Sequence, residues 1–164
     1  MFQRIHTLAW VCGVVLLGIA LALSLQRASA SRAPEPDDTA RANNVFGPWT
    51  TQDGNGVIAI EQCGEALCGR IVGIVRGPGE PIPKDVHGVS QCGLTIISKE
   101  KPTGDGSWLG EVVDPRSGKT YGAELWLDNR GNLRLRGFVG LPLLGQTQTW
   151  RRFTGRVTET CEVA

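Results

Sequence analysis

Few side chains in this sequence stand in a pattern that could carry chemistry, and the clearest pair is Asp85 with His87. A carboxylate beside an imidazole can act as an acid–base pair. No nucleophile with a supporting group accompanies them, and both lie in Gly77–Gly93, a segment rich in proline and glycine. Asp114 and Asp128 lie beside Pro or Asn, where aspartate is favoured because it bonds to the backbone of turns. We therefore predict no catalytic residue and no enzymatic activity.

The segment Ser117-Gly118-Lys119-Thr120 has a superficial likeness to a phosphate-binding loop. That loop needs a glycine five residues before its second glycine and a helix after it. Val113 stands at the glycine position, and the following residues alternate as a strand. We interpret the segment as a hairpin turn.

Four cysteines follow residue 43, namely Cys63, Cys68, Cys92 and Cys161. An even number of cysteines in an exported domain is typical of disulfides. We predict Cys63–Cys68 across a hairpin, which leaves Cys92–Cys161 as the second pair. The alternative is a metal site formed by cysteines with His87, but Cys-x4-Cys is a loose spacing for zinc. We therefore predict no metal and no cofactor.

The N-terminal region predicts export. Arg4 precedes an apolar run from Leu8 to Leu25, and Ala28-Ser29-Ala30 supplies small residues of the kind a signal peptidase reads. We interpret residues 1–30 as a signal peptide, or alternatively as a helical membrane anchor, since the run could just span a bilayer. Residues 31–43 are polar and proline-rich, which is typical of a disordered linker. The protein is thus expected in the periplasm or outside the cell, or anchored to the inner membrane with its domain outside the cytoplasm.

The charges of the remaining chain are balanced, with 13 Lys or Arg and 13 Asp or Glu from Asn44 onward. Proteins that bind nucleic acid or anionic membranes favour a basic face, so we expect neither partner, except a membrane through the N-terminal segment if it is retained. Glycine is abundant at 22 residues. Many glycines with few helix-length apolar patterns favour a turn-rich all-β domain.

Apolar residues alternate with polar ones in about eight segments separated by turns. The clearest hairpin joins Leu125–Leu127 to Leu133–Arg136 through an Asn/Gly-rich loop, and Gln146–Phe153 alternates again. Such a meander must close or cover its edges. We predict a small up-and-down antiparallel β-barrel over residues 44–155, followed by a tail at 156–164.

The hairpin that carries Cys63 and Cys68 can be given a register. If the two cysteines lie opposite each other across a four-residue loop, Glu61 faces Arg70 and Ile60 faces Ile71. Charges then meet on one face of the hairpin and aliphatic residues on the other, as paired strands require.

Large aromatic residues recur through the domain, and they could pack a core or line a cavity for an apolar ligand. The arginines of the last strands allow two roles. One is to stack on a tryptophan and close an end of the barrel, and the other is to hold a ligand carboxylate or phosphate from inside. In the last strand, either Trp150 and Arg152 or Thr149 and Arg151 point inward.

Two sets of residues carry a family resemblance. Gly47-Pro48-Trp49 resembles the opening of lipocalin-like barrels, in which the tryptophan plugs the closed end beneath an arginine of the final strand, and Arg152 is the matching arginine. Further segments resemble the bacterial secreted family called domain of unknown function 2147. They are Leu67-Cys68-Gly69-Arg70-Ile71, Asp114-Pro115, Gly118-Lys119-Thr120-Tyr121, Arg136-Gly137-Phe138-Val139-Gly140 and Gln146-Thr147-Gln148-Thr149-Trp150.

The resemblance implies an exported lipocalin-like barrel and no assigned activity. It departs from the family at Asp85-Val86-His87, where the family has an Asp followed by Asn-Pro. On the barrel analogy we expect a non-enzymatic binder of a small apolar or amphipathic ligand, with the Arg76–Gly93 loop near the mouth. The predicted lining is Ile58, Ile60, Ile71, Trp108, Val112, Tyr121, Leu125 and Leu135. The first alternative is a solid barrel that acts as a surface interaction module of the cell envelope, and the last is an enzyme.

Overall fold

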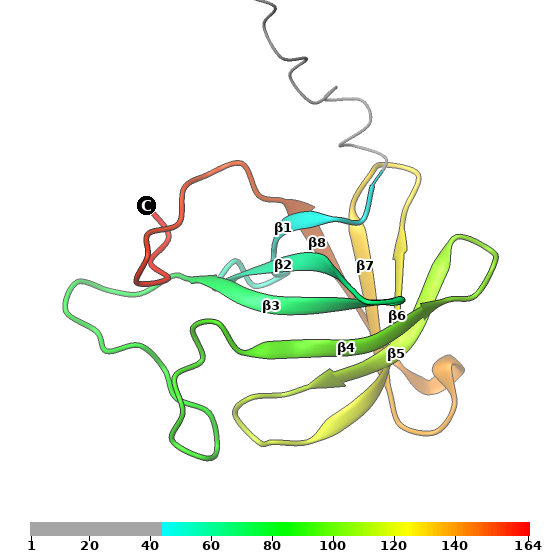
Figure 1. Ribbon diagram of the computed structural model, residues 1–164, viewed down its shortest axis with the longest axis horizontal. Coiled ribbons are helices and arrows are strands. Elements are labelled where there is room, and N and C mark those ends of the chain that lie inside the picture. The colour runs from blue at the N-terminus through cyan, green and yellow to red at the C-terminus, as the bar shows by residue number, and fades with distance from the viewer. Residues whose placement is uncertain (1–43) are drawn as a thin grey trace, which may run out of the picture. The chain divides into compact units, whose positions relative to one another are not determined.

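The structure is a computed structural model that describes residues 44–164. The predicted signal or anchor helix at residues 1–30 and the linker at 31–43 lie outside the described residues. Within the described part, eight strands follow one another around a closed barrel (Figure 1). The strands are β1 (Gly47–Thr50), β2 (Gly56–Cys63), β3 (Ala66–Ile74), β4 (Thr95–Pro102), β5 (Ser107–Val113), β6 (Thr120–Leu127), β7 (Leu133–Phe138) and β8 (Gln146–Arg152).

Every strand pairs antiparallel with its neighbours in sequence, and β1 pairs with β8 to close the ring. In that closing pair, Trp49 lies opposite Arg152 and Thr50 opposite Arg151. Closure removes the unpaired sheet edges that an open meander would expose. The predicted up-and-down barrel is therefore confirmed. No helix within residues 44–164 is long and apolar enough to cross a membrane.

The β2–β3 hairpin is tighter than predicted. Cys63 lies opposite Ala66, so Gly64 and Glu65 alone form the loop, and Ile58 rather than Ile60 lies opposite Ile71. The predicted register, in which the two cysteines face each other, is therefore wrong by two residues. Cys63 and Cys68 instead bond diagonally, with their Cα atoms 5.8 Å apart.

The predicted charge pair of this hairpin survives the change of register. Arg70 Nη2 lies 2.8 Å from Glu61 Oε1, although Glu61 is directly opposite Cys68. Long side chains reach diagonal neighbours across paired strands, so charge pairing by itself did not distinguish the two registers.

Strand β4 continues beyond Ser98 through the charged segment Lys99-Glu100-Lys101. The backbone of Lys99 is left-handed, with φ of 61°, and the pairing with β5 shifts between Ser98 and Lys101. A bulge adds one residue to a strand and changes which side chain points inward. Lys99 therefore points to solvent and Glu100 is fully buried.

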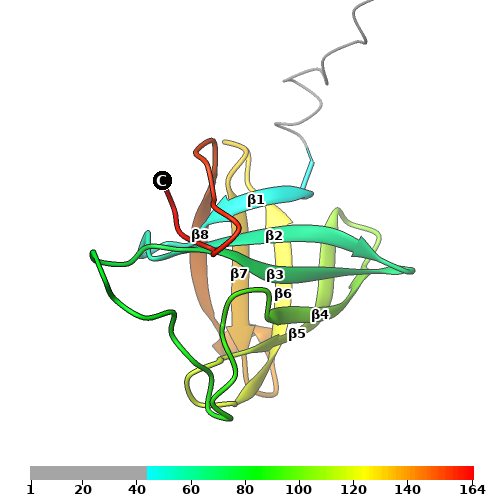
Figure 2. The same cartoon turned by 60° about the vertical axis from the view of Figure 1, so that its left-hand side comes forward.

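The chain after β8 turns back along the barrel and lies beside the end of β3 (Figure 2). Glu162 forms a parallel bridge with Ile74, and Ile74 donates its backbone N–H to the carbonyl of Cys161 at 2.7 Å. Cys161 is also bonded to Cys92 of the β3–β4 loop, as predicted. The C-terminal segment thus packs on the barrel and holds the longest loop in place.

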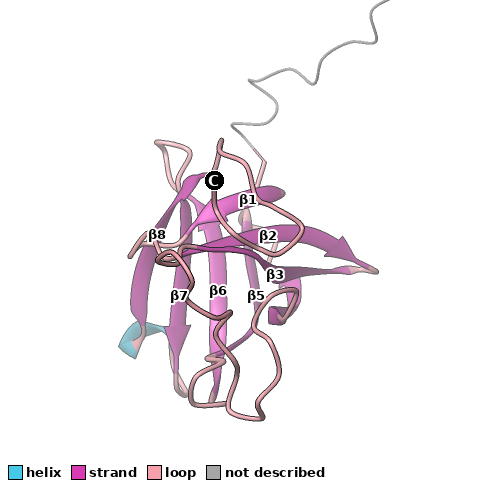
Figure 3. Ribbon diagram, turned by 90° about the vertical axis from the view of Figure 1, so that its left-hand side faces the viewer, coloured by secondary structure: helices cyan, strands magenta, loops and turns pink. Residues whose placement is uncertain are grey.

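The two ends of the barrel differ. One end is sealed by the apolar core around Trp49, Ile60, Leu125 and Leu133, all 0–1% exposed. The other end carries the four loops β1–β2, β3–β4, β5–β6 and β7–β8. The last of these includes the short 3-10 helix η1 (Pro142–Leu144), which Figure 3 shows at the foot of β7 and β8.

Candidate functional site

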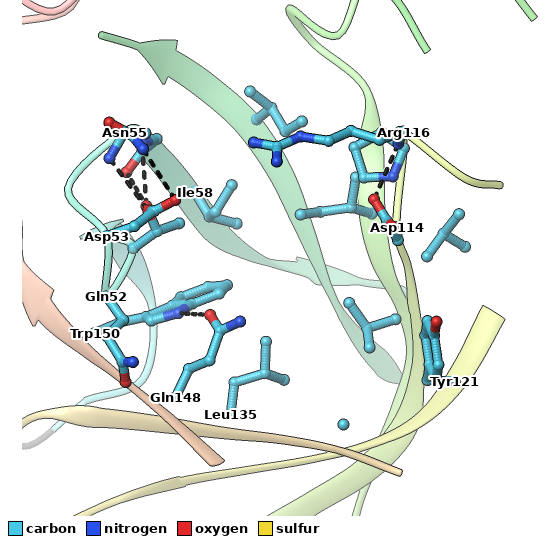
Figure 4. Close-up of a pocket in the computed structure, with 18 of the residues that line it drawn as sticks. Gln52, Asp53, Asn55, Ile58, Asp114, Arg116, Tyr121, Leu135, Gln148 and Trp150 are labelled. Carbon is cyan, nitrogen blue, oxygen red and sulfur yellow. Dashed lines mark hydrogen bonds between the residues drawn. The ribbon is translucent and has the colours of Figure 1, made fainter. Parts of the chain in front are cut away.

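A cavity of about 1250 Å3 opens at the loop-bearing end of the barrel. Residues from all four loops of that end line it, together with the inner faces of most strands. Figure 4 shows the lining side chains converging on an open space between the β1–β2 turn and the β5–β6 turn. The interior is therefore partly empty, whereas the solid-barrel alternative required it to be filled.

The deep part of the cavity is apolar. Five of the eight residues predicted to line it do so, namely Ile58, Ile71, Val112, Tyr121 and Leu135. Trp150 also lines the cavity and is 2% exposed, so Trp150 rather than Thr149 faces inward in β8. Cavities lined in this way suit apolar groups because contact with them removes apolar surface from water.

Three predicted lining residues, Ile60, Trp108 and Leu125, do not reach the cavity. Ile60 and Leu125 are at most 1% exposed within the core of the sealed end, and Trp108 packs against that core. Alternation along a strand predicts which face a side chain occupies, but it does not predict the height at which the core ends and the cavity begins. The prediction therefore placed these three residues on the correct face of their strands but at the wrong height along the barrel.

The sealed end is built as the lipocalin resemblance implied. Trp49 is fully buried, and its indole Nε1–H donates to the carbonyl of Val45 at 2.7 Å. The Arg152 guanidinium lies over the ring at 3.7 Å and donates to the carbonyls of Phe46 and Asn44. These contacts close the barrel opposite the cavity mouth.

The cavity has polar groups partway up its wall. Gln148 accepts a hydrogen bond from the Trp150 indole at 2.8 Å, and this leaves the amide nitrogen of Gln148 available to a ligand. Gln91 is buried and donates to the carbonyl of Lys84 at 3.0 Å, which leaves its amide oxygen available. Sequence reasoning missed both residues because glutamine carries no motif.

Two carboxylates at the rim are committed to their own turns. Asp53 accepts hydrogen bonds from Thr51 and Asn55, and Asp114 accepts from Ser117 Oγ at 2.7 Å and from Arg116 N at 2.9 Å. The hydroxyl of Thr51 is the main reason that the pKa of Asp53 is lowered, and the hydroxyl of Ser117 is the main reason that the pKa of Asp114 is lowered. Both serve as turn residues, as the sequence predicted for Asp114.

Arg116 extends from the Asp114 turn over the mouth, toward the side that carries Asn55 (Figure 4). Among the cavity-lining residues of the described chain it is the sole lysine or arginine. Sequence reasoning interpreted Asp114–Gly118 correctly as a turn but assigned Arg116 no role. The signal that could have found it is topological, since this turn and the Arg76–Gly93 loop belong to the same end of an up-and-down barrel.

Asp85 and His87, which could have formed an acid–base pair, lie in a loop and are not assembled as one. The Asp85 carboxylate accepts backbone N–H groups of His87 and Val89 at 2.9 and 2.7 Å, so it shapes its own loop. Neither Asp85 nor His87 lines the cavity, although Pro83 and Gln91 of the same loop do. The β3–β4 loop is thus near the mouth, as expected.

The β7–β8 loop forms an apolar lip beside the mouth, which we define as Val139, Leu141, Leu143 and Leu144. These side chains are 65–84% exposed, and Val139 and Leu144 also line the cavity. Exposed apolar clusters of this kind mark contact surfaces more often than chance.

Glu100 is the one carboxyl group of the described residues that is both fully buried and without a hydrogen-bond partner on either oxygen. Its burial raises the pKa of the group to about 9, so the carboxyl is neutral at pH 7. It lies opposite Leu67 in β3, toward the sealed end, and does not line the cavity. Sequence reasoning missed it because the bulge at Lys99 reverses the expected alternation.

Comparison with solved structures supports the fold. Protein HP1028 from the human pathogen Helicobacter pylori, described as a member of the lipocalin family, matches with a TM-score of 0.59. The two are 18% identical, and the match covers 68% of this chain and 84% of that one. At this identity the likeness concerns the fold alone. No curated protein matches the chain.

The family comparison covers almost the whole barrel. The pattern of domain of unknown function 2147, described as an uncharacterized protein conserved in bacteria, matches residues 47–152. That range runs from the first residue of β1 to the last of β8. The chain therefore belongs to the bacterial DUF2147 family, with a lipocalin-like barrel as its fold.

Proposed function

We propose that this protein is a non-enzymatic binding protein of the bacterial envelope that holds a small apolar or amphipathic ligand inside its barrel. The observation that carries the proposal is the cavity of about 1250 Å3, apolar at depth and open to solvent at one end. Cavities of this order can take up most of the surface of a small ligand. The carboxylates of the rim turns accept hydrogen bonds from the backbone and side chains of their own turns, which supports a binding role rather than a catalytic one.

The proposed location is the periplasm or the cell exterior. Two disulfides, Cys63–Cys68 and Cys92–Cys161, indicate an oxidising compartment. The apolar run and small residues of the N-terminal region support export.

Native mass spectrometry of the protein purified from its own host tests the proposal. We expect a retained small molecule in the wild-type protein and its loss in Leu135→Trp, because the larger ring would fill the cavity. Leu109→Trp is the matched control, since Leu109 is 44% exposed and does not line the cavity. Thermal unfolding of both variants shows whether they fold. A protein that carries no small molecule, and that takes up none from a lipid extract, would contradict the proposal.

The second candidate function is a surface interaction module, which the apolar lip favours. In that case Leu143→Asp would abolish binding of an envelope partner while Leu135→Trp would leave it unchanged. The two variants therefore distinguish a role of the interior from a role of the surface.

A further inference from the structure

We infer that the ligand is an anionic amphiphile, a molecule with an apolar chain and a carboxylate or similar acidic head, and that Arg116 binds the head at the cavity mouth. The inference rests on the proposed binding function and adds the chemical class of the ligand. The apolar chain would lie against Ile58, Ile71, Leu135 and Trp150.

The first support is the set of hydrogen-bond donors at the mouth, where Arg116 lies with the carboxylates of Asp53 and Asp114. Arg116 is the sole cation among the cavity-lining residues that the structure describes. Within residues 44–164 its guanidinium makes neither a hydrogen bond nor an ion pair. The other charged lining groups, Asp53 and Asp114, accept hydrogen bonds from their own turns, and the nearby charge of Arg116 contributes to the lowered pKa of Asp114. The donors of Arg116 therefore remain available to an acidic group from outside the chain.

The second support is the rigidity of the turn that presents Arg116. Asp114 accepts from the backbone N–H of Arg116 and from the Ser117 hydroxyl, and Gly118 donates to the Asp114 carbonyl at 2.7 Å. Val86 of the β3–β4 loop donates to the carbonyl of Pro115 at 3.0 Å, which fixes the turn to the neighbouring loop. A turn that is already ordered lowers the entropic cost of fixing the long side chain of Arg116 on a ligand.

The third support is the direction of the side chain. Arg116 extends from the β5–β6 turn across the mouth toward the opposite rim, and it is exposed there (Figure 4). A planar guanidinium can bond a carboxylate through two parallel N–H groups. An acidic head held there leaves the apolar chain directed into the barrel, toward the apolar residues of the deep part of the cavity.

Displacement of a fluorescent apolar probe from the purified full-length protein tests the inference. The competitors are dodecanoate, dodecan-1-ol and dodecyltrimethylammonium at pH 7.5, which share one apolar chain and differ in the charge of the head. We expect dodecanoate to bind at least about fivefold more tightly than dodecanol, because a charge-assisted pair at a partly exposed site contributes modestly. The ammonium compound should bind most weakly.

Arg116→Gln should remove the preference for dodecanoate over dodecanol and leave dodecanol affinity unchanged. Arg116→Lys should keep part of the preference. Lys119→Gln is the matched control, because Lys119 belongs to the same turn and does not line the cavity. Raising the salt concentration should reduce the preference in the wild-type protein and not in Arg116→Gln.

The outcomes separate the inference from the function on which it rests. If dodecanoate and dodecanol bind equally well, the binding function stands and the role of Arg116 is wrong. If the preference for dodecanoate persists in Arg116→Gln, another group binds the head and the assignment is overturned. If neither compound displaces the probe, the cavity does not bind amphiphiles and both proposals fail.

Discussion

The guanidinium carbon of Arg152 lies 3.7 Å from the centroid of the Trp49 ring, at the point where the last strand of the barrel meets the first. The same guanidinium donates to the carbonyl of Phe46 at 2.6 Å and to that of Asn44. One side chain thus covers the buried tryptophan and bonds the chain segment that precedes β1.

Arg152→Ala should destabilise the barrel by about 1–3 kcal/mol, since it removes a cation–π contact and leaves two carbonyls without their charged donor. Urea unfolding monitored by tryptophan fluorescence measures the change. Arg151→Ala is the control, because Arg151 is exposed in the same strand and should change the free energy of unfolding by less than about 0.5 kcal/mol. Equal effects of the two substitutions would contradict the role of Arg152.

Glu100 should make stability depend on pH. Its pKa is raised to about 9 in the folded protein and is near 4.5 when exposed. Between these values the unfolded state releases a proton that the folded state retains, so the free energy of unfolding falls as pH rises from 4.5 toward 9. Below pH 4.5 the residue is neutral in both states and adds no such penalty. The free energy of unfolding at pH 7 should therefore be lower than at pH 4.5 by about 3 kcal/mol because of this residue.

Glu100→Gln should therefore match the wild type near pH 4 and exceed it in stability at pH 7, because the amide cannot ionise. Denaturant unfolding at the two pH values measures this difference. Glu111→Gln is the control, since Glu111 is partly exposed and pairs with Lys99 at 2.8 Å on the outer face. A Glu100→Gln variant that is no more stable than wild type at pH 7 would show that the carboxyl has a partner when folded.

Gly110→Ala should destabilise the protein by about 1–3 kcal/mol. A Cβ at position 110 would lie 2.6 Å from the carbonyl oxygen of Ser98 and 2.8 Å from the Cα of Glu100, both of which are backbone atoms of the β4 bulge. Gly137→Ala provides the comparison, since its Cβ would meet only Val112 at 3.8 Å. Thermal unfolding of the pair should place Gly137→Ala close to wild type, and a similar loss in both would argue against the close approach at the bulge.

Removal of the Cys92–Cys161 bond should cost more stability than removal of Cys63–Cys68. The first joins residues 69 positions apart and the second residues 5 apart, and a longer loop confines the unfolded chain more. The double substitution Cys92→Ser/Cys161→Ser should lower the free energy of unfolding by about 2–4 kcal/mol. Denaturant unfolding alongside Cys63→Ser/Cys68→Ser measures the difference, and a larger effect of the short bridge would refute the expectation.

The sequence predicted the architecture because a barrel is specified by alternation and turns, which are local. It also predicted both disulfides, and the family resemblance implied the buried Trp49 with an arginine beside it. The hairpin register failed because Glu61 and Arg70 pair equally well directly or diagonally. Ile60, Trp108 and Leu125 were placed on the correct face, but the depth of the core depends on side chains from strands distant in sequence.

Glu100 in the interior and Arg116 at the cavity mouth were missed for different reasons. Glu100 points inward only because Lys99 adopts a left-handed backbone, and a charged segment gives no local sign of that. Arg116 gains its role from the topology, which brings a turn after β5 to the rim formed by loops from other strands. Neither the inward direction of Glu100 nor the position of Arg116 at the rim can be predicted from the residues adjacent to it in the sequence.

The described chain begins at the sealed end of the barrel, opposite the cavity mouth. Arg152 donates to the carbonyl of Asn44 beside the buried Trp49. Arg116 and the apolar lip lie around the cavity mouth at the other end. A label or support attached at Asn44 itself would therefore contact the sealed end and leave the residues that surround the cavity mouth unmodified.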